Sequence, residues 1–283
     1  MYHILVPTDF TPEAHNALEV AMHLAYRTGG RITLLHVIDA PRSAGIVSTG
    51  GTAGAAPMNG VFMVQLLQRT KRRMHELMAE VARAHPEVPV QDRVATGSDT
   101  DAAVLDMIRE LHADMVVVGA HVHAPATGLL SADSHAEWLI RLAPCPVLTV
   151  KHPAPTFEVH SIVFASDFSA EADRAVPGLR LLCAAFPEAT LHLLDVVTNA
   201  DHSARAIERI HSFANRHQFA AYEPDVFSAA RVSSGIPRYA EQAHADLVVM
   251  LTHGHSGLRH LLQGSIAESV AVQTDAPVLT LHT

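Results

Sequence analysis

Short apolar runs alternate with stretches of helical periodicity along the whole chain. After a first apolar run at Ile4–Thr8, Thr11 and Pro12 predict the start of a helix, because threonine suits an N-cap and proline suits the first helical position. Apolar residues then recur at helical spacing until Gly29-Gly30 ends the run. The alternation continues to residue 150, with strands expected at Arg31–Val37, Val90–Thr96, Met115–Gly119 and Pro146–Val150, and helices at Val61–His85, Asp101–His112 and Ser134–Leu142. This pattern is typical of an α/β fold, a parallel sheet covered by helices on both faces.

The pattern of the first half occurs a second time. The run His3–Phe10 is matched by Ser161–Phe168, and the closing run Pro146–Val150 is matched by Pro277–Leu281. A repeat of this length indicates two similar domains, which we place at 1–151 and 157–283. The expected strands of the second half are Ile162–Ser166, Thr190–Val197, Val226–Val232, Leu247–Thr252 and Val278–Leu281, and its expected helices begin at the N-cap Ser169 and cover His202–His217, Pro237–His244 and Ser265–Gln273. The first half is the longer one, and we place most of its extra residues in an insertion loop over 40–60.

Composition narrows the class of protein. Of the 283 residues, 48% are hydrophobic and 17% are charged, as in proteins with a well-buried core. Cys145 and Cys183 are too few for a disulfide framework, and the N-terminus shows no basic leader, so we expect a cytoplasmic protein. No apolar stretch is long enough to cross a bilayer, so no membrane partner is expected. The formal net charge of −9 argues against nucleic acid as a partner, because its binders carry clustered lysine and arginine.

Candidate chemistry gathers at the carboxyl ends of the expected strands, where ligands bind in open parallel sheets if the strand order reverses there. Asp9 and Asp167 each follow the first strand of their half. In the second half Gly254, Gly257 and Gly264-Ser265 precede the last helix, whose free N–H groups suit a phosphate. Turn formation and N-capping account for the same residues without any ligand. Neither a dinucleotide fingerprint nor a Walker loop is present.

Five sequence blocks, which have counterparts in the same order in both halves, resemble the universal stress protein family. They are the Val-Pro-Thr-Asp-Phe start, the Leu-Leu-His-Val second strand, the Ala-Asp-Met/Leu-Val-Val-Val/Met fourth strand, the His-Gly-His-Ser-Gly-Leu…Leu-Leu-Gln-Gly-Ser loop and the Ala-Pro-Cys-Pro-Val-Leu ending. The resemblance covers essentially the whole chain and is to the tandem-domain members. It implies, in each half, a five-stranded parallel sheet in the order 3-2-1-4-5, with the two domains paired through their last strands. In one subclass it also implies ATP binding.

The resemblance implies a nucleotide site mainly in the second half. The loop pattern of the ATP-binding subclass has Leu251 at its first glycine here, but the second and third glycines are kept. Asp167 and Val196 would then contact the adenosine. The phosphates would lie on Gly254, His255, Gly264, Ser265 and Ile266, and Ala165, Ser166, Met250 and His253 would line the same site.

The first half has a weaker version of this site. Its equivalent residues are Asp9, Val37, Gly119 and Ser134. However, Val122 and Asp133 stand where the family has glycines. A valine side chain hinders the approach of backbone to phosphate, and a carboxylate repels it, so we expect the first site to be degenerate.

Two classes of function remain open. The first is a stress-response protein that binds ATP without fast catalysis, because the sequence shows no activated nucleophile, no paired acid and base, and no lysine in the phosphate loop. At most it would hydrolyse ATP slowly. The second is a nucleotide-free interaction module, which Leu251, Val122 and Asp133 favour. His253 and His255 have the spacing of zinc ligands, but no cysteine supports them, so no metal is expected. An exposed edge strand makes a homodimer of chains the expected assembly.

Overall fold

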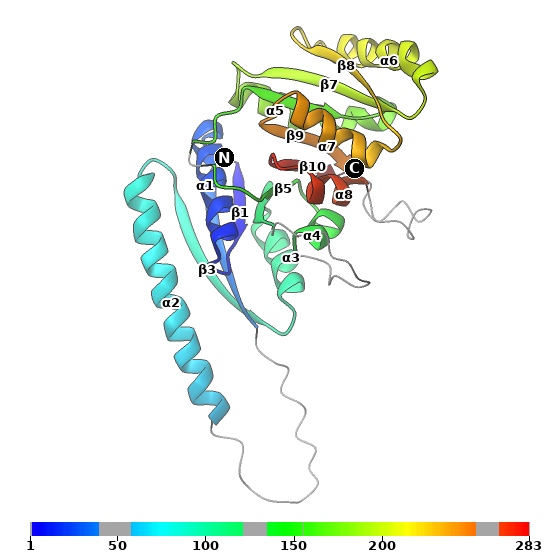
Figure 1. Ribbon diagram of the computed structural model, residues 1–283. Helices are drawn as coiled ribbons and strands as arrows, with labels where there is room; N and C mark the ends of the chain where they lie inside the picture. Colours follow the sequence, from blue (N-terminus) through cyan, green and yellow to red (C-terminus); the bar gives the residue numbers. More distant parts are fainter. Residues whose placement is uncertain (1, 40–57, 121–134, 155, 253–265, 283) are drawn as a thin grey trace, which may run out of the picture.

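The computed structural model describes residues 2–39, 58–120, 135–154, 156–252 and 266–282, and its strands form one sheet (Figure 1). The first half contains β1 (His3–Pro7), α1 (Pro12–Thr28), β2 (Arg31–Asp39), α2 (Met58–Ala84), β3 (Val90–Gly97), α3 (Thr100–Leu111), β4 (Met115–Gly119), α4 (His135–Leu142) and β5 (Val147–Val150). The second half contains β6 (Ser161–Ala165), the 3₁₀ helix η1 (Ala170–Ala175), α5 (Val176–Ala185), β7 (Thr190–Val197), the 3₁₀ helix η2 (Ala200–His202), α6 (Ser203–Arg216), β8 (Glu223–Ser228), α7 (Val232–Gln242), β9 (Leu247–Thr252), α8 (Ile266–Gln273) and β10 (Val278–His282). The strand order is β3-β2-β1-β4-β5-β10-β9-β6-β7-β8. The predicted α/β fold and the order 3-2-1-4-5 in each half are therefore confirmed.

The two halves join through their last strands. β5 and β10 pair antiparallel about Leu148 and Leu279, and Figure 1 shows them side by side between the halves. The hydroxyl of Thr149 donates to the carbonyl of Val278 (3.2 Å), and the hydroxyl of Thr280 donates to the carbonyl of Val147 (3.1 Å). This reciprocal pairing makes both strands internal, so the edges of the sheet are β3 and β8.

Each face of the sheet has one apolar core that runs through both halves. One core holds residues of α1, α2, α5 and α6, and the other holds residues of α3, α4, α7 and α8. Successive strand residues alternate between them, as Ile4 and Val6 face the first core and Leu5 faces the second. No helix in the described ranges combines the length and apolar composition that crossing a membrane requires.

α8, in the second half, is held at both ends by residues of the first half. Near its start, the guanidinium of Arg141 donates to both carboxylate oxygens of Glu268 (3.2 and 3.3 Å). At its end, the buried ammonium of Lys151 donates to the carbonyls of Val272 and Thr274, the latter at 2.9 Å. A positive charge suits the carboxyl end of a helix, although burial lowers the pKa of Lys151.

A mirrored contact runs from the second half to the first. His282 occupies the position in β10 that Lys151 occupies after β5, and its Nε2 lies 2.9 Å from the carbonyl of Ile140 in α4. The other ring nitrogen, Nδ1, is buried without a hydrogen-bond partner. Burial lowers the pKa of His282, so the neutral imidazole fits this place.

The predicted boundaries after the third strand of the second half are wrong. The strand is Glu223–Ser228 rather than Val226–Val232, and the helix begins at Val232 rather than at Pro237. Pro237 lies inside α7, where its missing N–H leaves only the carbonyl four residues earlier, in the first turn, without its helical partner. The predicted helix begins at the proline, because the first helical position is the one that proline favours, but α7 begins five residues earlier.

The start of the first helix also differs between the halves. Thr11 caps α1 as predicted, because its hydroxyl accepts from the N–H of Ala14 (3.3 Å) and Pro12 begins the helix. Ser169 precedes η1 instead of an α-helix, and its side chain makes no capping hydrogen bond. The α-helix proper begins only at Val176.

The extra length of the first half is shared between a segment and a helix. The predicted insertion loop 40–60 falls outside the described residues as far as residue 57, and α2 begins at Met58. α2 has 27 residues and α6 has 14, so the helix itself accounts for much of the difference. The insertion therefore lengthens the helix as well as the connection before it.

Candidate functional site

The carboxyl ends of β6 and β9 form the switch point of the second half. Ala165, the last residue of β6, pairs with Leu194 of β7 on one side and with Met250 of β9 on the other. The chain leaves β6 for β7 and returns to β9 on the opposite side, which is the arrangement that opens a crevice at strand ends. The first half repeats it, with β1 between β2 and β4.

An exposed aspartate follows the central strand in each half. Asp167 accepts from the N–H of Ser169 (3.0 Å), and Asp9 accepts from the N–H (3.0 Å) and the hydroxyl (2.5 Å) of Thr11. The next residue is a phenylalanine in the left-handed region in both halves, with φ 65° at Phe10 and 53° at Phe168. A bulky residue rarely adopts this conformation, and its recurrence shows that both halves build the same bend after their central strand. One carboxylate oxygen of each aspartate serves the turn.

An ion pair between a buried carboxylate and a half-exposed guanidinium supports this bend in the second half. Arg209 of α6 donates from Nε to the carbonyl of Asp167 (3.0 Å) and from Nη2 to the carboxylate of Asp195 (2.6 Å). Asp195 is only 4% exposed, and burial raises the pKa of its carboxyl, while the Arg209 charge offsets part of that rise. Sequence reasoning missed this pair. The aligned halves contained the signal, because the position of Asp195 holds His36 in the first half.

Val196, which the family resemblance implies contacts the base, is more buried than its equivalent in the first half, Val37. Val196 is 8% exposed, whereas Val37 is half-buried. Gly235 of α7 explains the difference, because a Cβ there would lie 2.5 Å from Cγ1 of Val196. The equivalent residue of α3 is Ala103, counted from the matching strands β3 and β8. The glycine lets α7 approach β7 closely and cover Val196.

A second close approach occurs in the first half at the end of β4. A Cβ on Gly119 would lie 2.7 Å from the N atom of Ala14 and closer still to the Glu13 carbonyl, so α1 starts directly against β4. Leu251 is the equivalent fifth residue of β9, and its side chain packs into the core that contains η1. A leucine and a helix start cannot share that space. The second half therefore has a 3₁₀ turn where α1 has its first turns.

Several residues of the predicted sites lie outside the described residues. These are Ser134, His253, Gly254, His255, Gly264 and Ser265, together with the Val122 and Asp133 positions. Ile266 is the first residue of α8 and is 48% exposed. The structure thus brings Ala165, Ser166, Asp167 and Met250 together at the switch point of the second half.

Two further groups of side chains bear on possible chemistry. Within the described ranges, no three histidine, cysteine, aspartate or glutamate side chains gather as a metal site would require. Cys145 is buried, and burial raises the pKa of its thiol to about 12, so it is not a nucleophile near neutral pH.

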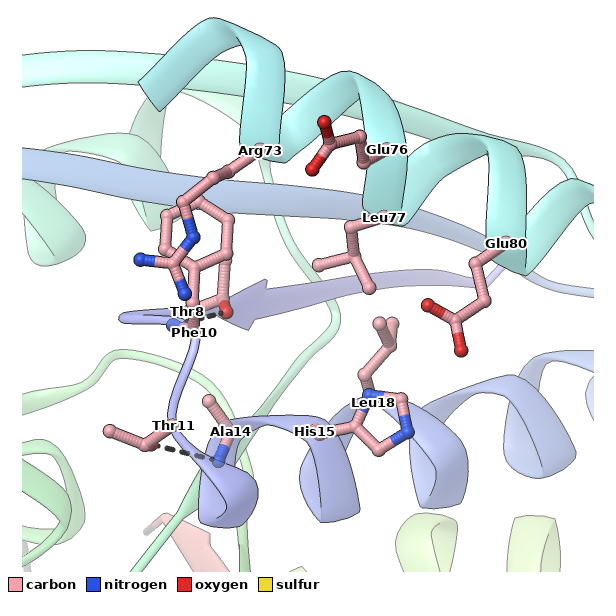
Figure 2. Close-up of a pocket in the computed structure, with 10 residues that line it drawn as sticks. All are labelled: Thr8, Phe10, Thr11, Ala14, His15, Leu18, Arg73, Glu76, Leu77 and Glu80. Atoms are coloured by element: carbon pink, nitrogen blue, oxygen red, sulfur yellow. Dashed lines mark hydrogen bonds between the residues drawn. The ribbon is translucent and has the colours of Figure 1, made fainter. Parts of the chain in front are cut away.

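A cleft of about 200 Å³ lies between α1 and α2 on the first half (Figure 2). Leu18 and Leu77 face each other across it, and the guanidinium of Arg73 lies 4.4 Å from the centre of the Phe10 ring. The remaining lining residues are Thr8, Thr11, Ala14, His15, Glu76 and Glu80. Sequence analysis did not predict this cleft, because Leu18 and Leu77 have the spacing of ordinary core residues.

The continuous sheet and its two switch points define a tandem open-sheet α/β protein. The universal stress protein family model matches residues 1–151 and again residues 158–282, so the chain belongs to the universal stress protein family. Universal stress protein Slr1230 of Synechocystis sp. is 27% identical over 295 aligned residues, which cover 100% of both chains.

A solved structure that spans the whole chain has the same fold. A universal stress protein from Archaeoglobus fulgidus superimposes with a TM-score of 0.73 at 19% identity, covering 99% of this chain and 98% of that one. A universal stress protein solved in complex with cAMP covers 44% of this chain and 98% of its own, at 22% identity and a TM-score of 0.37.

Proposed function

We propose that this tandem universal stress protein binds an adenine nucleotide, ATP, at the switch point of its second half and uses it as a regulatory ligand without fast catalysis. The observation that carries the proposal is the pairing of Ala165 with Met250 at the carboxyl ends of β6 and β9, beside the exposed carboxylate of Asp167. The second carboxylate oxygen of Asp167 is not used by the turn and can accept from a ribose hydroxyl or the adenine amine. The hydrogen bond from Nε of Arg209 to the carbonyl of Asp167 supports this bend.

The phosphate end of the ligand would meet the start of α8. Ile266 is exposed at this start, where backbone N–H groups lack helical partners and favour an anion. Glu268 lies in the first turn and would repel phosphate, but Arg141 of the first half pairs with both of its oxygens. The ion pair makes the helix start compatible with a bound anion.

The charged groups that the described residues place beside the switch point support slow or absent turnover. Asp195 and Arg209 pair with each other, so neither serves as a free base or as a free cation for a leaving group. We therefore propose a nucleotide-binding regulator, with ATP hydrolysis at most slow.

Matched asparagine variants test the proposal and assign it to one half. Asp167→Asn keeps an acceptor for the N–H of Ser169 but removes the charge, and Asp9→Asn makes the same change in the first half. We expect Asp167→Asn to weaken ATP binding about tenfold in calorimetry, and Asp9→Asn to leave it unchanged. cAMP serves as the second ligand, and released nucleotide is sought after denaturing the purified protein. The assignment to the second half is wrong if only Asp9→Asn weakens binding.

A nucleotide-free interaction module is the second candidate. Val196 is 8% exposed beneath α7, and Leu251 fills the place of the first loop glycine, so less room is open to a base and a phosphate chain than in the ATP-binding pattern. If no adenine nucleotide is released and neither ATP nor cAMP raises the melting temperature, this second function replaces the first.

We propose domains at 1–151 and 157–283, a homodimer of chains and a cytoplasmic location. Because β5 and β10 already pair within the chain, a dimer must use another surface, such as the edge β3 or β8. Light scattering coupled to size-exclusion chromatography measures the mass, and a monomer at all concentrations contradicts the dimer.

A further inference from the structure

We propose that the cleft between α1 and α2 binds a primary amine that carries one ammonium group and a short apolar tail. The cleft is separate from the nucleotide site that the family resemblance implies in the first half. Val37 of that site packs against the core beneath α3 and α4, whereas Leu18 and the half-buried Leu77 of the cleft belong to the core beneath α1 and α2. The two sites are therefore on opposite faces of the sheet.

The floor of the cleft selects an apolar group. Leu77 is half-buried and offers accessible apolar surface, whereas Leu18 and Ala14, which also line the cleft, are 2% and 6% exposed (Figure 2). The hydroxyls of Thr8 and Thr11 are already engaged, because they accept from the N–H groups of Phe10 (3.1 Å) and Ala14 (3.3 Å). They add little to the recognition of a polar ligand. About 200 Å³ is the space of roughly seven water molecules, so the ligand is small.

The open side of the cleft selects a cation. Glu76 and Glu80 are one helical turn apart on α2, and both line the cleft. Within the described residues neither carboxylate has an ion-pair partner, and like charges at this spacing repel each other. The imidazole of His15 is 3.3 Å from the carboxylate of Glu19 on its own helix. An ammonium between Glu76 and Glu80 removes their repulsion and makes charge-assisted hydrogen bonds.

The far end of the cleft excludes a second positive charge. The ring of Phe10 closes this end, and the guanidinium of Arg73 lies over that ring. An ammonium there would meet a like charge and an apolar surface. The ligand class is therefore a monoamine with a tail that ends at Phe10, rather than a diamine.

The second half shows the same region filled. Arg209 is equivalent to Leu77, because each lies the same number of residues before the matching strands β8 and β3. Its side chain extends to Asp167 and Asp195, and Phe213 packs on Phe168 with ring centres 5.3 Å apart. The second half thus offers matched control positions for the first.

Protein-observed NMR on the full chain, with labelled leucine methyl groups, tests the proposal. The probes are n-pentylamine, n-pentanol and pentanoate, which share a tail and differ in the charge of the head group. We expect n-pentylamine to shift the methyl signals of Leu18 and Leu77, n-pentanol to bind about tenfold more weakly, and pentanoate not to bind. Equal binding of the amine and the alcohol, or no shift with the amine, overturns the proposal.

Variants locate the site and separate it from other occupants. Glu76→Gln and Glu80→Gln should each weaken n-pentylamine binding about threefold, while Glu208→Gln, the equivalent of Glu76 on α6, leaves it unchanged. Leu77→Arg introduces the residue of the second half and should abolish the shift of Leu18. If both glutamine variants bind as tightly as the parent, the proposal is wrong. It is also wrong if N-acetyl-lysine amide binds more tightly than n-pentylamine, because the occupant is then a lysine of a partner protein.

Discussion

The two halves follow almost the same course through their central strands, yet they close different gaps between helices and sheet. In the first half, Gly119 lets α1 begin directly against β4. In the second, Leu251 fills that space, and the helix start gives way to η1. On the opposite face of the sheet, it is the second half that has the glycine. Gly235 there lets α7 approach β7. One missing side chain thus decides in each half which helix approaches the sheet closely.

The same comparison explains the cleft between α1 and α2. Leu77 leaves space beside Phe10, whereas Arg209 at the equivalent position extends to Asp195. The ring of Phe168 is buried among other aromatic rings, but Phe10 is only half-buried and is covered by Arg73. A repeat can therefore keep its backbone and change its binding surface through a few side chains.

The largest effect should come from placing the second-half residue at the end of β4. Gly119→Leu forces a side chain into the backbone of Glu13, and we expect it to lower the free energy of unfolding by about 3 kcal/mol. Urea denaturation measures the loss. Leu251→Ala is the matched change and should cost about 1–2 kcal/mol, since Leu251 is only half-buried. A neutral Gly119→Leu would show that Leu251 does not explain η1.

Breaking the ion pair of the second half should have the next largest effect. Arg209→Leu leaves Asp195 buried without its cation, and we expect a loss of about 2 kcal/mol at neutral pH, reduced from the usual value because the Arg209 side chain is 42% exposed. Folding already raises the pKa of Asp195, so its contribution favours the fold at low pH and is lost as pH rises through that pKa. Arg209→Leu should raise the pKa of Asp195 further. The unfolding free energy that this variant loses should therefore be smaller at acidic pH.

Two variants control this pH experiment. Asp195→Asn in the Arg209→Leu background should recover part of the loss, because the buried charge is gone. Arg205→Leu, on the exposed side of α6, should change little. A deficit that is equal at neutral and acidic pH would show that Arg209 acts through packing alone.

A smaller effect is expected where α7 meets β7. Gly235→Ala places a methyl group 2.5 Å from Val196, and we expect a loss of about 1 kcal/mol after the better helix propensity of alanine is included. Val196→Ala should relieve the clash, so the double variant should be less unstable than the sum of the two single variants. Additive losses in urea denaturation would mean that α7 simply moves away.

The smallest expected effect concerns the mirrored contacts of Lys151 and His282. Because folding lowers the pKa of His282, the folded state binds fewer protons than the unfolded state just below the ordinary histidine pKa of about 6.5, and stability is lost as pH falls through that range. His282→Gln keeps a donor for the carbonyl of Ile140 but does not titrate. It should flatten the decrease between pH 7 and pH 5, and an unchanged slope would assign the decrease to other histidines.

Local patterns predicted most of the fold. The helix start at Thr11 and Pro12 is as expected, because capping is a local signal. The strand order in both halves is also as expected, but that expectation rests on the family resemblance and not on local patterns. The start of α7 was misplaced because Pro237 resembles a first helical residue. The 3₁₀ turn after Ser169 could not be read locally, since its cause, Leu251, is distant in the sequence.

The candidate site was less predictable than the fold. Asp167 and Met250 were expected at the strand ends and lie there, since parallel strands bring their ends to one edge. The ion pair between Arg209 and Asp195 forms because α6 packs on β7 with these two side chains in register. Sequence composition does not reveal that register. The cleft likewise depends on how far α2 stands from α1, and Leu77 has the spacing of a core residue whether or not that gap is filled.

The attachment of α8 at both ends couples the two halves thermodynamically. Its first turn is paired with Arg141 and its last carbonyls with Lys151, so α8 cannot be displaced without straining or breaking bonds to the first half. A ligand that shifts this helix therefore changes the unfolding free energy of both halves together. Hydrogen exchange in the first half can then report occupancy of the second.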